Sequence, residues 1–111
     1  MTPVSEATLT QMVDAIVAEV SPERVILFGS QARGDQEHQS DVDLLVIQSE
    51  PFNAVGKRDA QSVRLSKRLA RFPVPTDILL YARDEVEYWR DSLNHVVARA
   101  LREGKVLYER P

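Results

Sequence analysis

Apolar residues at helical spacing predict that the chain begins with a helix from about Ser5 to Val20. These apolar positions are Leu9, Met12, Val13, Ile16, Val17 and Val20. Ser5 has a side chain suited to the N-cap, and Pro22 lies just beyond the expected end of the helix. One side of this helix should therefore pack against the rest of the protein.

Four shorter segments have the pattern of strands. Val25–Phe28 is apolar on both faces, as in a strand buried on both sides, and Asp41–Ile47 is the second predicted strand. Val74–Tyr81 is the third, because prolines are tolerated where a strand starts. Lys105–Glu109 is expected to add a short edge strand.

Two further helices are predicted between these strands. The first covers Asn53–Arg71, with Asn53 or a neighbour as its cap. The second opens at Asp84, with Glu87 three residues on in a capping-box-like arrangement, and breaks near Asp91. The order of elements predicts an α/β or α+β fold, a small mixed sheet with helices packed on it, although the pattern alone does not fix the strand order.

Length, composition and charge narrow the class of protein. The 111 residues fit one domain over 1–111, and 43% hydrophobic with 28% charged residues is typical of a globular chain. The net charge of −3 argues against a protein that grips long nucleic acid, so nucleic acid is not expected as the direct substrate. The absence of cysteine, of a secretory leader and of a long apolar run predicts a cytoplasmic protein without a membrane segment.

The dipeptide Gly29-Ser30 lies where the first strand is expected to turn into a helical turn. A glycine there lets the backbone approach a ligand, and the free N–H groups of the next turn attract phosphate. Taken alone, such a dipeptide is more often a plain turn.

Three aspartates are the candidate chemical groups. Asp41 and Asp43 are two residues apart on a predicted strand, so they share a face, and two like charges at this separation are costly unless a cation joins them. The alternative is a solvated strand start. Asp77 lies among apolar neighbours in a strand that we expect to be covered on both faces, where a carboxylate needs a metal or an arginine partner.

The combination is much more specific than its parts. Gly-Ser, ten residues and then Asp-x-Asp would arise by chance roughly once in 10⁵ start points at average residue usage. Gly29-Ser-Gln-Ala-Arg-Gly34, followed by Ser40-Asp-Val-Asp-Leu-Leu-Val46, resembles the signature of the polymerase-beta-type nucleotidyltransferases. Pro75-Thr-Asp-Ile-Leu79 is similar to the segment with their third acid, and the chain end resembles that of their minimal branch, the MNT proteins.

The resemblance implies a role for each matched residue. Gly29 and Ser30 would hold the triphosphate of ATP, while Asp41 and Asp43 would bind two Mg²⁺ ions. Asp77 would ligate the catalytic metal and help to deprotonate the acceptor hydroxyl. The role of Arg33 is left open between a phosphate contact and an ion pair that fixes the turn.

The resemblance also implies a partner. MNT proteins commonly pair with a helical HEPN-domain toxin and act as antitoxins by adenylylating one of its tyrosines. A small-molecule transferase of the aminoglycoside-modifying kind and an antitoxin that acts by binding alone are the alternatives, and a homo-oligomer is possible. One side of the predicted 53–71 helix is basic, and this side is either a solvated face or a docking surface. Its residues are Lys57, Arg64, Lys67, Arg68 and Arg71.

Overall fold

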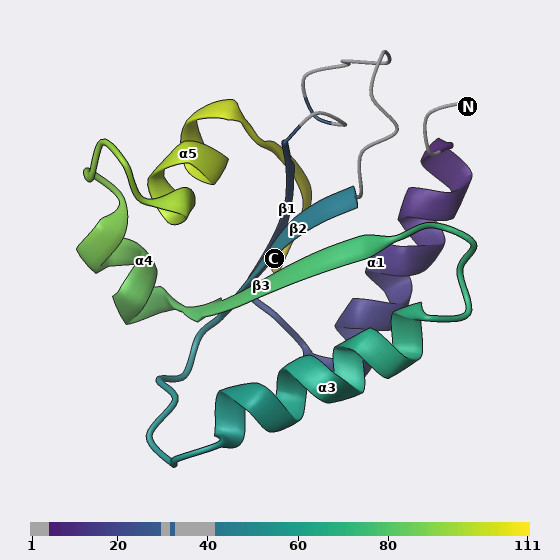
Figure 1. Ribbon diagram of the computed structural model, residues 1–111, viewed down its shortest axis with the longest axis horizontal. Coiled ribbons are helices and arrows are strands. Elements are labelled where there is room, and N and C mark those ends of the chain that lie inside the picture. Colours follow the sequence, from purple (N-terminus) through teal and green to yellow (C-terminus); the bar gives the residue numbers. More distant parts are fainter. Residues whose placement is uncertain (1–4, 30–31, 33–41) are drawn as a thin grey trace.

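The computed structural model describes residues 5–29, 32 and 42–111. The elements in chain order are α1 (Glu6–Val20), β1 (Arg24–Phe28), β2 (Val42–Gln48), α3 (Lys57–Leu69), β3 (Thr76–Ala82), α4 (Arg83–Trp89), α5 (Val96–Glu103) and β4 (Lys105–Glu109). The four strands form one sheet in the order β3-β2-β1-β4 (Figure 1). β2 is parallel to β3, whereas β1 is antiparallel to both β2 and β4, so the expected mixed sheet is confirmed.

Helices cover both faces of the sheet. α1 and α3 lie on one face, and α4 and α5 lie on the other (Figure 1). Alternate residues of β2 therefore belong to two different cores: Val42, Leu44 and Val46 pack with α1 and α3, whereas Leu45 and Ile47 pack with α4 and α5. This double burial explains why the sequence of β2 is almost continuously apolar.

The predicted 53–71 helix begins later than expected. Gly56, with a φ of 81°, immediately precedes α3, and Asn53 lies outside the helix. Val55 is fully exposed and does not belong to the apolar side of the helix, where Leu65 and Leu69 are buried. The predicted start is wrong because Val55 continues the apolar spacing of the helix in the sequence. In the structure the chain turns at Gly56, and the helix begins only after it.

The third strand and the helix after it also differ in detail from the expectation. β3 starts at Thr76 rather than Val74, although the Pro75 carbonyl already accepts a hydrogen bond of 2.9 Å from the Val42 N–H. The predicted pairing of Asp84 with Glu87 as a cap is wrong. Glu85 reaches back instead and accepts a 2.9 Å hydrogen bond from the N–H of Ala82.

The expected break in the last helical region is confirmed. α4 ends at Trp89, and α5 starts only at Val96. The imidazole Nδ1 of His95 caps α5 by accepting a 3.1 Å hydrogen bond from the N–H of Val97. None of the helices in the described ranges has the length and apolarity that a bilayer crossing needs.

Candidate active site

Gly29 follows the last residue of β1. A residue with a side chain at this position would displace the neighbouring carboxylate of Asp43. The φ of Gly29 is 76°, in the left-handed region. A Cβ built on Gly29 would overlap the Oδ2 atom of Asp43. The backbone of Gly29 and the Asp43 carboxylate are thus in direct contact, which joins two parts of the predicted motif.

Asp43 and Asp77 are brought together by strand pairing. They are partners in the register of the parallel strands β2 and β3, so their side chains lie on the same face of the sheet. Neighbouring strands are about 4.8 Å apart. Their face is the one that carries Leu45 and Leu79, on the α4 and α5 side. Residues 34 positions apart in sequence therefore form one acidic pair at the end of the sheet.

The two carboxylates differ in exposure. Asp43 is half-buried, whereas Asp77 is exposed. The expectation that this strand is covered on both faces is confirmed beyond Asp77, because Ile78 and Leu80 pack in one core and Leu79 packs in the other. Asp77 itself, the second residue of β3, is exposed, so its carboxylate reaches solvent instead of being enclosed by the apolar cover.

Three of the predicted site residues, Ser30, Arg33 and Asp41, lie outside the described residues. Over residues 5–29, 32 and 42–111, no group of three His, Cys, Asp or Glu side chains is arranged to hold a metal ion. Of the six predicted site residues, the structure describes Gly29, Asp43 and Asp77, and these three lie together.

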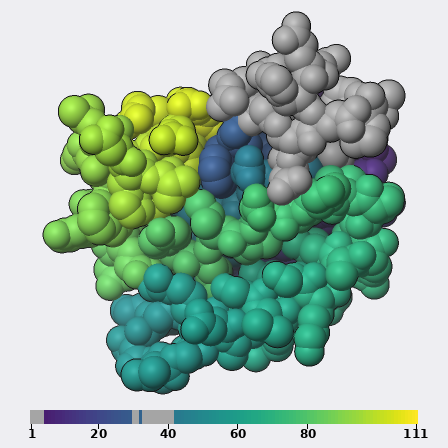
Figure 2. Space-filling model, in the orientation of Figure 1, coloured from purple at the N-terminus to yellow at the C-terminus, as the bar shows by residue number. Residues whose placement is uncertain are grey.

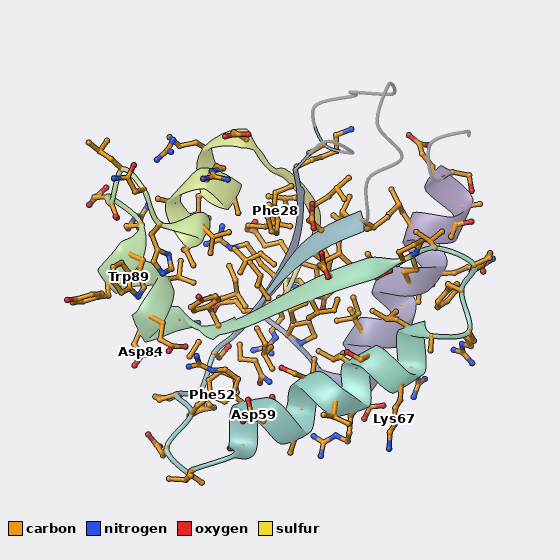
Figure 3. The ribbon with its side chains drawn as sticks, in the orientation of Figure 1. Phe28, Phe52, Asp59, Lys67, Asp84 and Trp89 are labelled. Carbon is orange, nitrogen blue, oxygen red and sulfur yellow. The ribbon has the colours of Figure 1, made fainter. Side chains whose placement is uncertain are left out.

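The surface around this pair is recessed. Figure 2 shows atoms of β1 and β2 set back between α5 and β3. Phe28, the last residue of β1, is 8% exposed and packs in the core that includes α5 (Figure 3). Carboxylate oxygens are ligands that suit Mg²⁺, and the glycine backbone beside Asp43 lets a phosphate chain approach closely.

An aromatic group beside α4 is structural. The rings of Trp89 and His95 are stacked, with centroids 4.0 Å apart and planes at 9°, and Tyr81 meets His95 edge-on at 5.9 Å. Trp89 packs against the core under α4 and α5, while Tyr88 is 77% exposed. His95 caps the start of α5. In the sequence, the only sign of this role is that His95 directly precedes the apolar residues Val96 and Val97.

The basic side of α3 is partly used inside the molecule. Arg64 and Arg68 lie 3.7 Å and 3.4 Å from the carboxylate of Glu19 on α1. These two arginines therefore help to hold α1 against α3. Lys57, Lys67 and Arg71 are exposed.

Comparison with protein families identifies the chain. A model of the nucleotidyltransferase domain matches residues 9–107. Over 58 residues the chain is 40% identical to a candidate protein adenylyltransferase of Methanocaldococcus jannaschii, an alignment that covers 52% of this chain and 54% of that protein. The match thus spans about half the length of the curated relative.

Solved structures share the fold. A candidate nucleotidyltransferase from Sulfolobus solfataricus superimposes with a TM-score of 0.63 at 20% identity, covering 94% of this chain and 79% of that one. A toxin–antitoxin structure with AMP-PNP gives a TM-score of 0.52 at 19% identity, covering 96% and 75%. A mutant of the toxin–antitoxin MntA-HpeT gives 0.51 at 16% identity, with the same coverage. With the family model matching nearly the whole length and the acidic pair in place, the chain belongs to the nucleotidyltransferase domain family.

Proposed function

We propose that residues 1–111 form a single Mg²⁺-dependent nucleotidyltransferase domain that transfers AMP from ATP to a hydroxyl group. The observation that carries this proposal is the meeting of Gly29, Asp43 and Asp77 at one end of the sheet. Family membership supports the reaction class, and the structural neighbour solved with AMP-PNP supports a nucleotide as substrate.

The residues present suit Mg²⁺. Asp43 and Asp77 offer carboxylate oxygens from adjacent strands, and Asp41 precedes Asp43 by two positions in the sequence. We propose that these three hold two Mg²⁺ ions together with the phosphates. When bound, the ions supply positive charge that stabilises the attacking and leaving oxygens. The absence of a Cβ at Gly29 leaves Asp43 in its position and leaves room for the triphosphate.

The proposed step is an in-line displacement. The acceptor oxygen attacks the α-phosphorus of ATP, a new oxygen–phosphorus bond forms, and the bond from the α-phosphorus to the bridging oxygen breaks. Pyrophosphate leaves with that oxygen. The acceptor proton passes to the carboxylate of Asp77, which is exposed at the edge of the sheet and thus accessible to an incoming hydroxyl. Ser30 and Arg33 are proposed to bind the phosphates.

The proposed acceptor is a tyrosine of a HEPN-type toxin, which makes the chain an antitoxin. Two structural neighbours are toxin–antitoxin complexes, and the curated relative is a candidate protein adenylyltransferase. Transfer to a small molecule of the aminoglycoside type and neutralisation by contact alone are the competing functions. The clustering of Asp43 and Asp77 favours catalysis, because contact alone does not require adjacent carboxylates.

The test combines nucleotide binding with mass analysis of the partner. Calorimetry should show ATP binding that needs Mg²⁺, and the toxin encoded beside this protein should gain the mass of AMP on incubation with ATP. Asp41→Ala and Asp43→Asn should abolish the mass gain, whereas Asp59→Asn, a matched change on α3 (Figure 3), should not.

Two results would overturn the proposal. ATP binding of equal strength in excess chelator would contradict the metal site. A toxin that stays unmodified but is still neutralised by the Asp41→Ala protein would establish the binding-only function instead.

A further inference from the structure

The strand that carries Asp77 has an outer edge without a strand partner in the described part of the chain, since β3 ends the order β3-β2-β1-β4. Val42 pairs with Thr76, and the Val42 N–H donates to the Pro75 carbonyl at 2.9 Å. In a parallel ladder this register directs the backbone groups of Asp77 and Leu79 inward to β2. The N–H and C=O groups of Thr76, Ile78 and Leu80 then face outward.

The two ends of this outer edge differ. At the carboxyl end, the side chain of Glu85 takes the N–H of Ala82, and Arg58 pairs with Glu85 and lies 4.8 Å and 5.5 Å from the ring centroids of Phe52 and Tyr81. These side chains close that end to another strand. The open stretch is the amino-terminal half of β3, which is the half that contains Asp77. Figure 2 shows β3 on the visible surface of the molecule.

A groove of about 370 Å³, lined largely by apolar side chains, adjoins this open stretch. Leu69, Phe72, Val74 and Ile78 line it, and all four belong to or pack against the core on the α1 and α3 face. The groove therefore lies on the face of the sheet opposite to the Asp77 side chain.

Positive charge adjoins the groove on the α3 side, where the guanidinium of Arg71 lies 5.6 Å from the ring centroid of the groove residue Phe72. Ser66 and Ala70 also line the groove. The exposed cation Lys67 is the next residue after Ser66, and the exposed cation Arg71 is the next residue after Ala70. Figure 3 shows Lys67 at the end of α3 remote from Asp59. A segment seated here is favoured if acidic residues flank its apolar ones.

We infer that the acceptor protein adds an extended tyrosine-containing segment to β3 as a fifth strand. This inference rests on the proposed function and deepens it by naming the acceptor site. Side chains alternate between faces along a strand, so a tyrosine opposite Asp77 points to the acidic face while the residue on each side of it points into the groove. Residues two positions from the tyrosine return to the face of Asp77 and should be uncharged, so the acidic residues that meet the cations beside the groove lie three positions from the tyrosine.

The long tyrosine side chain suits this geometry. Directly opposite Cβ atoms on neighbouring strands are about 5 Å apart, and β2 with Asp43 lies one strand further in. The phenol oxygen reaches across that span to the α-phosphorus, while Asp77 stands between the added strand and Asp43 to receive its proton. The transfer is the displacement described above, with AMP joined to the phenol oxygen and pyrophosphate released.

Two synthetic peptides test the spacing. On each side of the tyrosine, the first has leucine, alanine and glutamate in that order, so that leucine and glutamate share the groove face, and the second has the leucines and alanines exchanged. With ATP and Mg²⁺, label from ATP should enter the first peptide at least about tenfold faster, because only its leucines fall into the groove, a preference of roughly 1.4 kcal/mol. Equal labelling of the two peptides, or labelling of neither, would overturn the inference.

Two paired variants test the backbone edge. Ile78→Pro removes an outward N–H, and Ile78→Ala removes the side chain but keeps that N–H. The proline variant should raise the peptide KM about three- to tenfold over the alanine variant, as loss of one hydrogen bond predicts. Mg²⁺-dependent ATP binding should be equal in both. Equal KM values in two folded proteins would overturn the inference.

A charge reversal tests the same site even if the Ile78→Pro protein fails to fold. Lys67→Glu should raise the KM of the first peptide, and this effect should shrink with added salt, whereas Lys57→Glu at the other end of α3 should change nothing. Equal effects of the two reversals would contradict the site. Failure of wild-type protein to bind ATP with Mg²⁺ would instead refute the proposed function itself, so the two failures are distinguishable.

Discussion

Gly29 and Gly56 have similar backbone conformations but different surroundings. Their φ angles are 76° and 81°. A Cβ at Gly29 would overlap the carboxylate of Asp43, whereas a Cβ at Gly56 would meet nothing within 4 Å. Substitutions at the two glycines therefore distinguish the effect of backbone strain from the effect of a clash with Asp43.

Gly56→Ala should destabilise the fold by about 1 kcal/mol, the cost of a left-handed alanine, and leave transfer intact. Gly29→Ala should cost more than this, because Asp43 must move, and should remove detectable transfer. Thermal melts and label transfer from ATP measure the two effects. Equal losses of activity in both variants would show that the Gly29–Asp43 contact has no role in the reaction.

The exposure of Asp77 predicts a variant that loses activity without losing stability. Asp77→Asn changes an exposed side chain on an edge strand, so the free energy of unfolding should change by no more than about 0.5 kcal/mol. Transfer should fall by at least about 10²-fold, as loss of a proton acceptor predicts. Denaturant melts and initial rates test both values, and a marked loss of stability would make Asp77 a structural residue.

At the scale of elements, the junction of β3 and α4 depends on one carboxylate. Glu85 accepts the N–H of Ala82 and pairs with Arg58 of α3, and its side chain is 28% exposed. Glu87 pairs only with Arg90 among the described residues, and its side chain is 61% exposed. These glutamates are two positions apart in α4, yet they belong to different environments.

Glu85→Ala should destabilise the protein by about 1–2 kcal/mol, because it removes a helix cap and leaves a half-buried arginine without its carboxylate. Glu87→Ala should fall within about 0.5 kcal/mol of wild type. Urea unfolding followed through the fluorescence of Trp89, the single tryptophan of the chain, measures both. A Glu85→Ala protein as stable as the Glu87→Ala protein would show that the junction does not depend on this contact.

At the scale of the whole molecule, an ion pair joins the start of β1 to the start of α4. Arg83 donates to both carboxylate oxygens of Glu23, through Nε at 2.9 Å and through a terminal nitrogen at 2.7 Å. These hydrogen bonds, and to a lesser extent the charge of Arg83, hold the pKa of Glu23 below its ordinary value of 4.5. The same pair raises the pKa of Arg83.

A lowered carboxyl pKa gives stability that is present above pH 4.5 and is lost as the pH falls through the folded-state pKa. Glu23→Gln should therefore lower the melting temperature at neutral pH and flatten its decline below pH 4.5. Asp14→Asn, at an exposed position of α1, is the control and should retain the wild-type decline. Parallel acid declines in wild type and Glu23→Gln would exclude this pair as a source of the pH dependence.

The sequence by itself determined most of the elements and the family. Period 3.6 and buried apolar runs located α1, β1 and β2, since side-chain periodicity is a local property of each segment. The motif of Gly29-Ser30 followed by Asp41 and Asp43, with Asp77 as a later third acid, indicated the nucleotidyltransferase family, which the family comparison confirms. Ser30, Arg33 and Asp41 remain predictions, because they lie outside the described residues.

Only the tertiary structure decided how these elements meet. Local periodicity contains no information on strand order, so it could not place Asp77 on an edge strand opposite Asp43 or reveal the contact of Asp43 with Gly29. The same holds for the arginines of α3, which looked like one basic face until Arg64 and Arg68 proved to pair with Glu19 of α1. Contacts between residues distant in sequence depend on which faces pack together, and that packing arises only when the whole chain folds.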